Sequence, residues 1–287
     1  PTGLAAADVN GDLYPDIVLT QYLDYDNSAL AVLLNQGNGA LDAPAETVVP
    51  GWLSAVAVGD LNADGDVDLV LGNVKDQTLS VRLGLGDGTF PAQVSYRTGL
   101  NAAGGLHGQR LVLADLNADS KLDLVVATDQ ENAVAVFLGP GDGSLAPFVQ
   151  YPQGQFTSAV AIGDFNRDGV PDMARGHHDG VFTSLLFGRG DGSFIATAAY
   201  PSGAGSRELV SADLNGDRLA DVVTLGDSGV LSVLLRRADG SLGSETTYAV
   251  PRGDLQLADL NGDGLPDIVT QWNLDVSVLL NLDDGTF

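Results

Sequence analysis

One nine-residue pattern recurs through the chain and restricts its fold more than any other feature. The pattern is Asp-x-Asn-x-Asp-x-x-x-Asp, and it occurs six times, starting at Asp8, Asp60, Asp115, Asp164, Asp213 and Asp259. Successive starts are 52, 55, 49, 49 and 46 residues apart. Self-similarity at such a period is typical of repeat proteins, in which each unit needs its neighbours to bury its apolar surface.

Each copy of the pattern lies between segments that have the composition of strands. An apolar stretch such as 55–58 precedes it, and a β-branched run such as 17–19 follows. A third strand-like segment such as 79–83 ends in a glycine-rich turn, and a more polar segment such as 246–250 leads to the next copy. Helical periodicity is nowhere sustained. Each repeat therefore predicts four short antiparallel strands, A to D, and the chain predicts an all-β fold, a β-propeller of four-stranded blades.

The repeats predict a single propeller domain over residues 1–287. The expected blades are 1–50, 51–98, 99–152, 153–201, 202–251 and 252–287. The last blade lacks its outer strand, because the sequence ends just after the Asp284-Gly285 turn. Two interpretations stay open, six blades with an unfinished last sheet, which we favour, or a seven-bladed ring of which six repeats are visible. The sequence begins at Pro1 without a Met, which suggests a processed product or part of a larger chain or assembly.

The pattern places oxygen ligands at positions 1, 3, 5 and 9 of a tight loop, and the backbone carbonyl at position 7 adds another. Hard oxygen ligands without nitrogen or sulfur indicate calcium, and up to six ions are expected. Three carboxylates crowded in one loop also repel each other without a cation. The candidate ligands are Asp8, Asn10, Asp12, Tyr14, Asp16; Asp60, Asn62, Asp64, Asp66, Asp68; Asp115, Asn117, Asp119, Lys121, Asp123; Asp164, Asn166, Asp168, Val170, Asp172; Asp213, Asn215, Asp217, Leu219, Asp221; and Asp259, Asn261, Asp263, Leu265, Asp267.

Position 6 divides the six loops. It is glycine in the loops that start at Asp60, Asp164 and Asp259, and glycine adopts positive φ freely. The other three loops have Leu13, Ser120 and Arg218, which we expect not to adopt positive φ. The loops with glycine are therefore predicted to bind calcium most strongly, and the other three to be weaker or distorted.

The paired motifs resemble those of the FG-GAP/VCBS repeat family, which also includes the head regions of integrin α-subunits. Residues 59–65 and 163–169 look like the calcium signature of the family, and 85–90 and 187–194 look like its second signature. The resemblance covers the whole chain. It implies a propeller with calcium in the A–B loops, usually in secreted or cell-surface proteins that bind or adhere. Integrin heads have seven blades with calcium in only some of them, so six motifs in six repeats departs from that pattern.

The face opposite the calcium loops is expected to vary. In this strand order the A–B and C–D loops share one face, and the B–C and D–A loops share the other. The B–C/D–A face carries aromatic residues and histidines, which suit contacts with carbohydrate or protein. Its candidate ligand-binding residues are Trp52, His107, Phe156, His177, His178 and Trp272. Alternatively, the two tryptophans pack between blades, and the histidines belong to a polar loop.

Composition narrows the function classes. A formal net charge of −25 and a pI near 4.1 argue against nucleic acid as a partner, which needs Lys and Arg for phosphate contacts. The chain has no cysteine and no apolar run of membrane-spanning length. No nucleophile motif or other catalytic arrangement is recognisable, and no catalytic residue is predicted.

The favoured function is a non-catalytic, calcium-stabilised adhesion module that binds a glycan or a protein through the B–C/D–A face, in the manner of a lectin. A structural or assembly module of a larger surface or secreted protein is the alternative, and a polysaccharide-active hydrolase or lyase is the third. All three place the chain outside the cell, at the cell surface or in the periplasm.

Overall fold

The computed structural model describes residues 2–91, 94–97, 110–127, 133–152, 157–177, 182–203, 205–273 and 275–287. Over these ranges the chain forms 23 β-strands and no helix. The strands pair into antiparallel sheets in which sequence neighbours are hydrogen-bonded neighbours. The chain divides into two compact units, one of residues 1–115 and 119–152, the other of residues 116–118 and 153–287.

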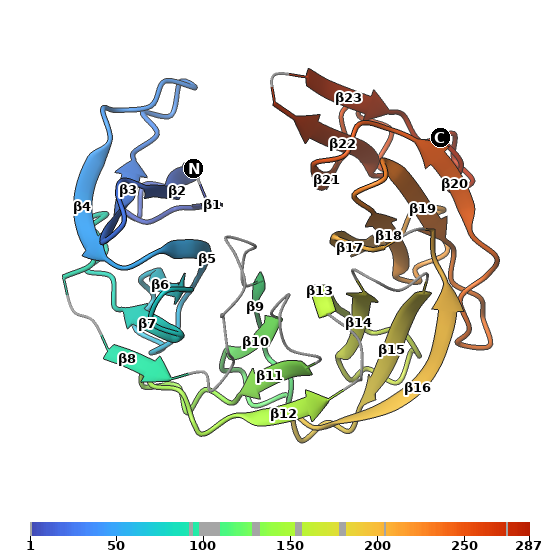
Figure 1. Ribbon diagram of the computed structural model, residues 1–287, viewed down its shortest axis with the longest axis horizontal. Helices are drawn as coiled ribbons and strands as arrows, with labels where there is room; N and C mark the ends of the chain where they lie inside the picture. The colour runs from blue at the N-terminus through green and yellow to red at the C-terminus, as the bar shows by residue number, and fades with distance from the viewer. Residues whose placement is uncertain are drawn as a thin grey trace. The chain divides into compact units, whose positions relative to one another are not determined.

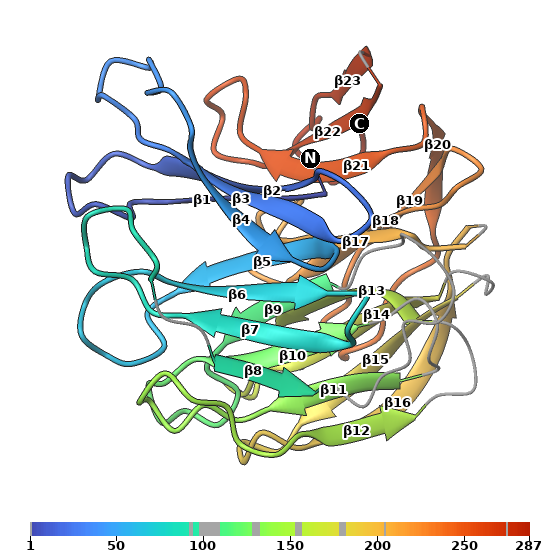
Figure 2. The same cartoon turned by 60° about the vertical axis from the view of Figure 1, so that its left-hand side comes forward.

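The first unit contains three four-stranded sheets, with strand orders β1-β2-β3-β4, β5-β6-β7-β8 and β9-β10-β11-β12 (Figure 1). Figure 2 shows the strands β5 to β8 running side by side. The first strands of successive sheets, β1, β5 and β9, are neighbours. The strands are β1 (Gly3–Ala7), β2 (Asp16–Tyr22), β3 (Asn27–Leu33), β4 (Ala45–Pro50), β5 (Leu53–Gly59), β6 (Asp68–Asn73), β7 (Thr78–Arg82), β8 (Val94–Arg97), β9 (Arg110–Ala114), β10 (Asp123–Ala127), β11 (Ala133–Phe137) and β12 (Val149–Pro152).

The second unit repeats this arrangement with two four-stranded sheets and one three-stranded sheet. Here β13, β17 and β21 are the neighbouring first strands. The strands are β13 (Thr157–Gly163), β14 (Asp172–His177), β15 (Phe182–Gly188), β16 (Phe194–Pro201), β17 (Glu208–Ala212), β18 (Asp221–Leu225), β19 (Val230–Leu234), β20 (Thr246–Ala249), β21 (Asp254–Ala258), β22 (Asp267–Trp272) and β23 (Asp275–Leu279).

Apolar side chains between successive sheets form the core of each unit. Every residue of β6, β10 and β18 is buried, which explains why these strands are apolar without alternation. One cluster fills the space between the second and third sheets around Val70, Leu124 and Phe137. Another lies between the fifth and sixth sheets around Val223 and Ile268. The prediction of an all-β propeller built from antiparallel blades is confirmed.

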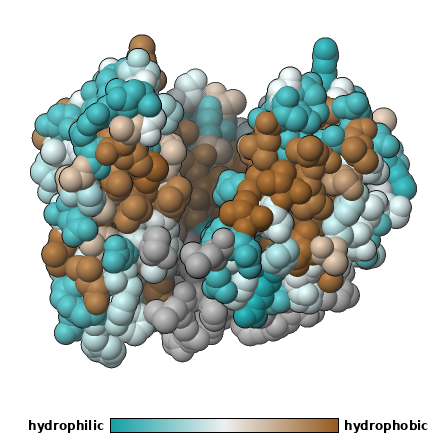
Figure 3. Space-filling model, turned by 90° about the horizontal axis from the view of Figure 1, so that it is seen from above, coloured by the Kyte–Doolittle hydropathy of each residue, from teal (hydrophilic) through white to brown (hydrophobic). Residues whose placement is uncertain are grey.

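The sixth sheet has three strands, β21, β22 and β23, as the sequence predicts. Because no fourth strand covers β23 among the described residues, its apolar side chains remain exposed. Val276 is 62% exposed and Val278 is 48% exposed. Leu4 in β1 is exposed as well. Figure 3 shows apolar surface exposed on one side of the molecule.

Candidate functional site

The six Asp-rich loops join the first strand of each sheet to the second, for example β1 to β2 and β5 to β6. The aspartate at position 1 folds each loop back on itself. In all six loops it accepts a hydrogen bond from the backbone N–H at position 6, at 2.6–3.0 Å. Such local side-chain to backbone bonds are the reason why Asp and Asn favour turns.

Positions 3 and 5 extend the same turn. In the Asp60 loop the Asn62 amide oxygen accepts the N–H of Asp64, and the Asn62 amide nitrogen donates to the Asp64 carboxylate at 2.7 Å. Asp64 in turn accepts the N–H of Asp66 at 2.9 Å. The loops at Asp8, Asp164 and Asp259 repeat all three bonds.

The aspartate at position 9 has a role that the sequence did not reveal. It begins the second strand of each sheet and is fully buried in all six loops. One of its oxygens accepts the N–H of the second residue after the third strand, or of the last residue of β15 in the fourth sheet, at 2.6–2.8 Å. In the loops that start at Asp8, Asp60, Asp164, Asp213 and Asp259, its other oxygen accepts the N–H of loop position 2, at 2.7–3.0 Å. This aspartate therefore ties the A–B loop to the end of strand C, whether or not it also binds a metal.

The expectation that Leu13, Ser120 and Arg218 avoid positive φ is wrong. Their φ angles are 71°, 65° and 66°, in the same region as those of the glycines at position 6. Position 4 also has positive φ in every loop, at Gly11, Ala63, Ala118, Arg167, Gly216 and Gly262. The hydrogen bond from position 6 to the first aspartate holds the backbone in this conformation, so residue type changes its strain and not its shape. Any difference in calcium affinity among the loops stays a prediction.

Burial and like charge raise the pKa of several position-9 carboxyls. Desolvation by burial is the main cause, and two neighbouring carboxylates of the same loop add to it. The pKa of Asp172 is raised to about 6 with Asp168 and Asp164 as the neighbours, and that of Asp221 is raised to about 6 beside Asp217 and Asp213. Each loop thus concentrates negative charge that a bound cation would compensate.

The loop residues fit an oxygen-coordinated cation. Within the described ranges no three His, Cys, Asp or Glu side chains converge as a metal-binding group. Many of the carboxylate oxygens accept backbone N–H groups. A carboxylate offers about four lone-pair sites, so an oxygen that accepts an N–H can still bind a cation. Two buried oxygens, Asp60 Oδ1 and Asp164 Oδ1, have no hydrogen-bond donor among the described residues. Both belong to position 1 of their loops, where the sequence predicts a calcium ligand.

On the opposite face of the first unit, Trp52 is the centre of an aromatic cluster. It lies between β4 and β5, and its indole N–H donates to the Tyr25 carbonyl at 2.7 Å. The rings of Tyr22 and Tyr25 meet it edge-on, with centroids 6.4 and 5.5 Å away. The Lys75 ammonium lies 4.7 Å from the centroid of the Tyr25 ring. Loops predicted to share the B–C/D–A face are therefore in contact here.

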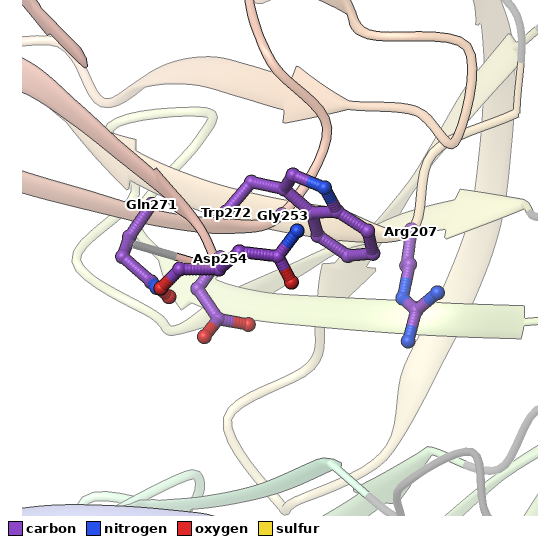
Figure 4. Close-up of a pocket in the computed structure, with 6 residues that line it drawn as sticks. Arg207, Gly253, Asp254, Gln271 and Trp272 are labelled. Carbon is purple, nitrogen blue, oxygen red and sulfur yellow. The ribbon is translucent and has the colours of Figure 1, made fainter. Parts of the chain in front are cut away.

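In the second unit, Trp272 lines a pocket of about 190 Å³. The other lining residues are Arg207, Gly253, Asp254, Gln271 and Asn273 (Figure 4). In Figure 4 the indole of Trp272 points toward the Arg207 guanidinium. Arg252 lies over the Trp272 ring at 4.3 Å, and Arg207 pairs with Asp227 at 3.1 Å. Arg207 comes from the segment before β17, and nothing in the sequence singled it out.

The structure places the remaining candidates differently. His177 is the last residue of β14 and is fully buried, so the prediction that it lies in a loop of the B–C/D–A face is wrong. Its Nε2 lies 2.9 Å from the Ser184 hydroxyl, and its ring packs on Phe182. The side chain fills the interior because the strand extends further than the sequence indicated. His107, Phe156 and His178 lie outside the described residues.

Comparison with known families identifies the repeats. The FG-GAP-like repeat matches residues 8–71, 60–126, 115–174 and 213–270. The chain belongs to the FG-GAP-like repeat family. No curated protein matches it significantly. Within the described residues there is no apolar helix of membrane-spanning length.

Solved structures share the fold of this FG-GAP-like repeat protein at low sequence identity. One is an Agrocybe aegerita lectin that recognises non-reducing terminal N-acetylglucosamine, with 20% identity, a TM-score of 0.68, and coverage of 99% of this chain and 78% of the lectin. Another is the Pseudomonas aeruginosa periplasmic gluconolactonase PpgL, with 15% identity, a TM-score of 0.64, and coverage of 98% and 73%. A third is the V. cholerae biofilm matrix protein Bap1, with 18% identity, a TM-score of 0.56, and coverage of 88% of this chain and 40% of Bap1.

Proposed function

We propose that this FG-GAP-like repeat chain is a non-catalytic, calcium-stabilised module that binds a glycan through its B–C/D–A face, outside the cell, at the cell surface or in the periplasm. The Trp272 pocket carries the proposal. It combines an aromatic ring with an acid, two amides and a guanidinium, which come from the start of β21, the end of β22 and the segment before β17. Binding sites typically combine an apolar wall with a few convergent polar groups in this way. A sugar offers matching chemistry, with apolar C–H groups for the ring and hydroxyls for the polar groups.

The size of the pocket favours one sugar ring. Drug-sized ligands occupy pockets of roughly 300–1,000 Å³, whereas this one has about 190 Å³. It therefore suits the terminal residue of a glycan, with the rest of the chain in solvent. The similarity to a lectin that recognises a non-reducing terminal sugar supports this choice, although the low identity makes it support by fold alone.

The lining residues favour binding over turnover. Glycoside hydrolysis uses two carboxyl groups, roughly 5–9.5 Å apart, on either side of the scissile bond. Asp254 is the one acid among the described residues that line the pocket. A gluconolactonase shares the fold, so catalysis is tested directly. Turnover on polysaccharides is a control in the experiment below.

The proposed calcium ions belong to the other face. The side chains at positions 1, 3 and 5 and the carbonyl at position 7 would hold them, with the position-9 aspartate completing the shell. Calcium bound there would neutralise carboxylates that otherwise repel each other, and so would stabilise each blade. The buried Oδ1 atoms of Asp60 and Asp164, which have no donor in the described ranges, support calcium binding by these two loops in particular.

The alternative is a structural or assembly module within a larger protein. It is favoured by the exposed apolar side chains of β23, which another strand or domain could cover. A structural module needs no glycan. A measurement of glycan binding therefore distinguishes it from the proposed binding module.

A glycan array followed by calorimetric titration tests the proposal. We expect binding to at least one terminal sugar, a loss of tenfold or more in affinity for Trp272→Ala and Asp254→Asn, and no turnover. Trp52→Ala removes the other tryptophan from a different unit and is the matched control. Binding lost only in Trp52→Ala would assign the glycan site to the aromatic cluster around Trp52. No binding to any glycan would favour the structural module.

A further inference from the structure

A buried arginine next to one Asp-rich loop has no hydrogen-bond acceptor for its side chain in the part of the chain that the structure describes. Arg236 follows β19 and is only 3% exposed. Its Nε, Nη1 and Nη2 atoms donate to none of the described residues. Burying an unpaired charge is strongly unfavourable, so such a group needs a partner that explains it.

The backbone does not require arginine at this position. The Arg236 N–H donates to Asp221 at 2.6 Å, as the corresponding residue does in every other sheet. In the second and third sheets that residue is Gly84 or Gly139, and in the first and sixth it is Asn35 or Asn281. The long charged side chain is therefore a feature of the fifth sheet alone.

The side chain of Arg236 reaches back to the loop of the preceding sheet. Its guanidinium carbon lies 5.6 Å from the centroid of the Phe165 ring, and Phe165 is position 2 of the Asp164 loop. In the sixth sheet, Asn281 makes the equivalent contact: its amide donates to the carbonyl of Leu214, position 2 of the Asp213 loop, at 2.7 Å. Burial lowers the pKa of Arg236, while the Asp172 and Asp164 carboxylates act in the opposite direction. The positive charge therefore lies within electrostatic reach of the Asp164 loop.

The Asp60 loop provides a comparison. Both loops have glycine at position 6, and both have a buried Oδ1 of the first aspartate with no donor among the described residues. The position that corresponds to Arg236 is Gly139 for the Asp60 loop, which contributes no side chain. Besides the Arg236 guanidinium, the loops differ in charge at position 4, where Arg167 replaces Ala63, and at position 7, where Val170 replaces Asp66.

We propose that Arg236 is a built-in counter-ion of the Asp164 loop that lowers the affinity of this loop for divalent cations relative to the Asp60 loop. The inference depends on the proposal that the loops bind calcium. A guanidinium near the carboxylates supplies part of the positive charge that they need, and it repels a second cation. Because the group is buried, solvent and salt screen this repulsion only weakly. We expect the Asp164 loop to bind calcium at least tenfold more weakly than the Asp60 loop.

Arg236→Asn is the variant of choice, because the chain already uses asparagine at this place. Asn35 and Asn281 donate from their amides to the carbonyls of Pro15 and Pro266, at 3.0 and 3.1 Å. The substitution should therefore fit the fold while it removes the charge. Arg237→Asn is the control, since Arg237 is the adjacent residue and is exposed.

Calcium titration by calorimetry, together with anomalous diffraction at limiting calcium, measures the two loops separately. In the wild-type protein the Asp60 loop should fill before the Asp164 loop. Asp66 and Arg167 favour the same order, so the Arg236→Asn variant is the deciding measurement. In Arg236→Asn the Asp164 loop should tighten at least tenfold, whereas Arg237→Asn should leave it unchanged. Adding Asp168→Asn to Arg236→Asn should abolish the gain, because Asp168 belongs to the same loop.

Equal filling of the two wild-type loops, or an unchanged Asp164 loop in Arg236→Asn, would overturn the role of Arg236 while leaving calcium binding intact. A gain that persists with Asp168→Asn would also overturn it. No calcium in any loop at millimolar concentration would overturn both proposals.

Discussion

Replacing Asp68 by alanine separates the structural role of an Asp-rich loop from its proposed metal-binding role. Asp68 is fully buried and accepts the N–H groups of Leu61 and Gly84 at 2.9 and 2.8 Å. In Asp68→Ala both donors are left buried without an acceptor. The free energy of unfolding should therefore fall even when a chelator has removed all divalent cations.

The structure sets the size of this effect. Each buried donor left without a partner costs about 1–3 kcal/mol, which gives about 2–6 kcal/mol for two. Burial raises the pKa of Asp68, which means that the charged carboxylate itself is destabilised by its surroundings, and its removal offsets part of the loss. We therefore expect Asp68→Ala to lower the free energy of unfolding by about 2–3 kcal/mol. At about 2–4 °C per kcal/mol, the melting temperature should fall by roughly 5–10 °C.

Asp64→Ala is the matched control in the same loop. Asp64 is exposed, and its partners are the Asp66 N–H and the Asn62 amide, which water can replace. In chelator this variant should lose less than about 1 kcal/mol, as exposed substitutions usually do. In calcium at 100 times the dissociation constant, it should also lose up to about 2.7 kcal/mol of ligand-linked stability.

Calorimetric melts of the wild type and both variants, in chelator and in calcium, give the answer. The distinguishing result is a pattern in which Asp68→Ala is destabilised under both conditions and Asp64→Ala mainly in calcium. An Asp68→Ala protein that melts with the wild type in chelator would refute the structural role of position 9. If calcium raised the melting temperature of Asp64→Ala as much as that of the wild type, Asp64 would not be a calcium ligand.

Two further predictions concern loop strain and pH. Ala118→Gly and Ser120→Gly should each stabilise the Asp115 loop by about 0.5–1 kcal/mol in urea denaturation, because both residues have positive φ, 59° and 65°. Gly264→Ala at the corresponding open position of the sixth loop should destabilise it, and the opposite result for either change would contradict the strain argument. In chelator, the melting temperature should rise as the pH falls from 7 toward 5. The folded pKa values of Asp172 and Asp221, about 6, lie above the usual aspartate value, so the folded state binds protons first and stability is lost as the pH rises through 6. Calcium should reduce this rise, and a falling melting temperature in chelator would contradict it.

The repeat itself made the fold predictable from the sequence. Six copies of one pattern placed the loops, and the apolar segments around them placed the strands, to within a few residues. The third strand of the second sheet runs over Thr78–Arg82, whereas the sequence indicated 79–83. Such ends depend on pairing with the neighbouring strand and not on local composition. The same reason explains why β14 continues to His177, which pairs with Thr157.

The site was predictable to a smaller extent. Residue types predicted which side chains gather in each loop, but not how the hydrogen bonds divide among them. The conformations of Leu13 and Arg218 could not be deduced from residue preference, because a bond to the first aspartate overrides it. The roles of Arg207 and Arg236 could not be predicted from the sequence. Neither belongs to the repeated pattern, and each contacts residues that are distant in the sequence. Only the packing of successive sheets brings Arg236 to Phe165.

The aspartate bias of the chain has two causes, and they act at different positions. The chain has 34 aspartates and four glutamates, and each of the six loops has an aspartate at positions 1, 5 and 9. Positions 1 and 5 hold acids suited to a cation, and six calcium ions would change the net charge from −25 to −13. Position 9 needs a short carboxylate with or without a cation, since its two oxygens must reach two backbone N–H groups that the fold has already fixed. The longer side chain of glutamate would displace both oxygens in a buried space that has no room for adjustment. Six of the aspartates are therefore required by the blades themselves, and calcium binding would have been built on a loop that these buried acids already held together.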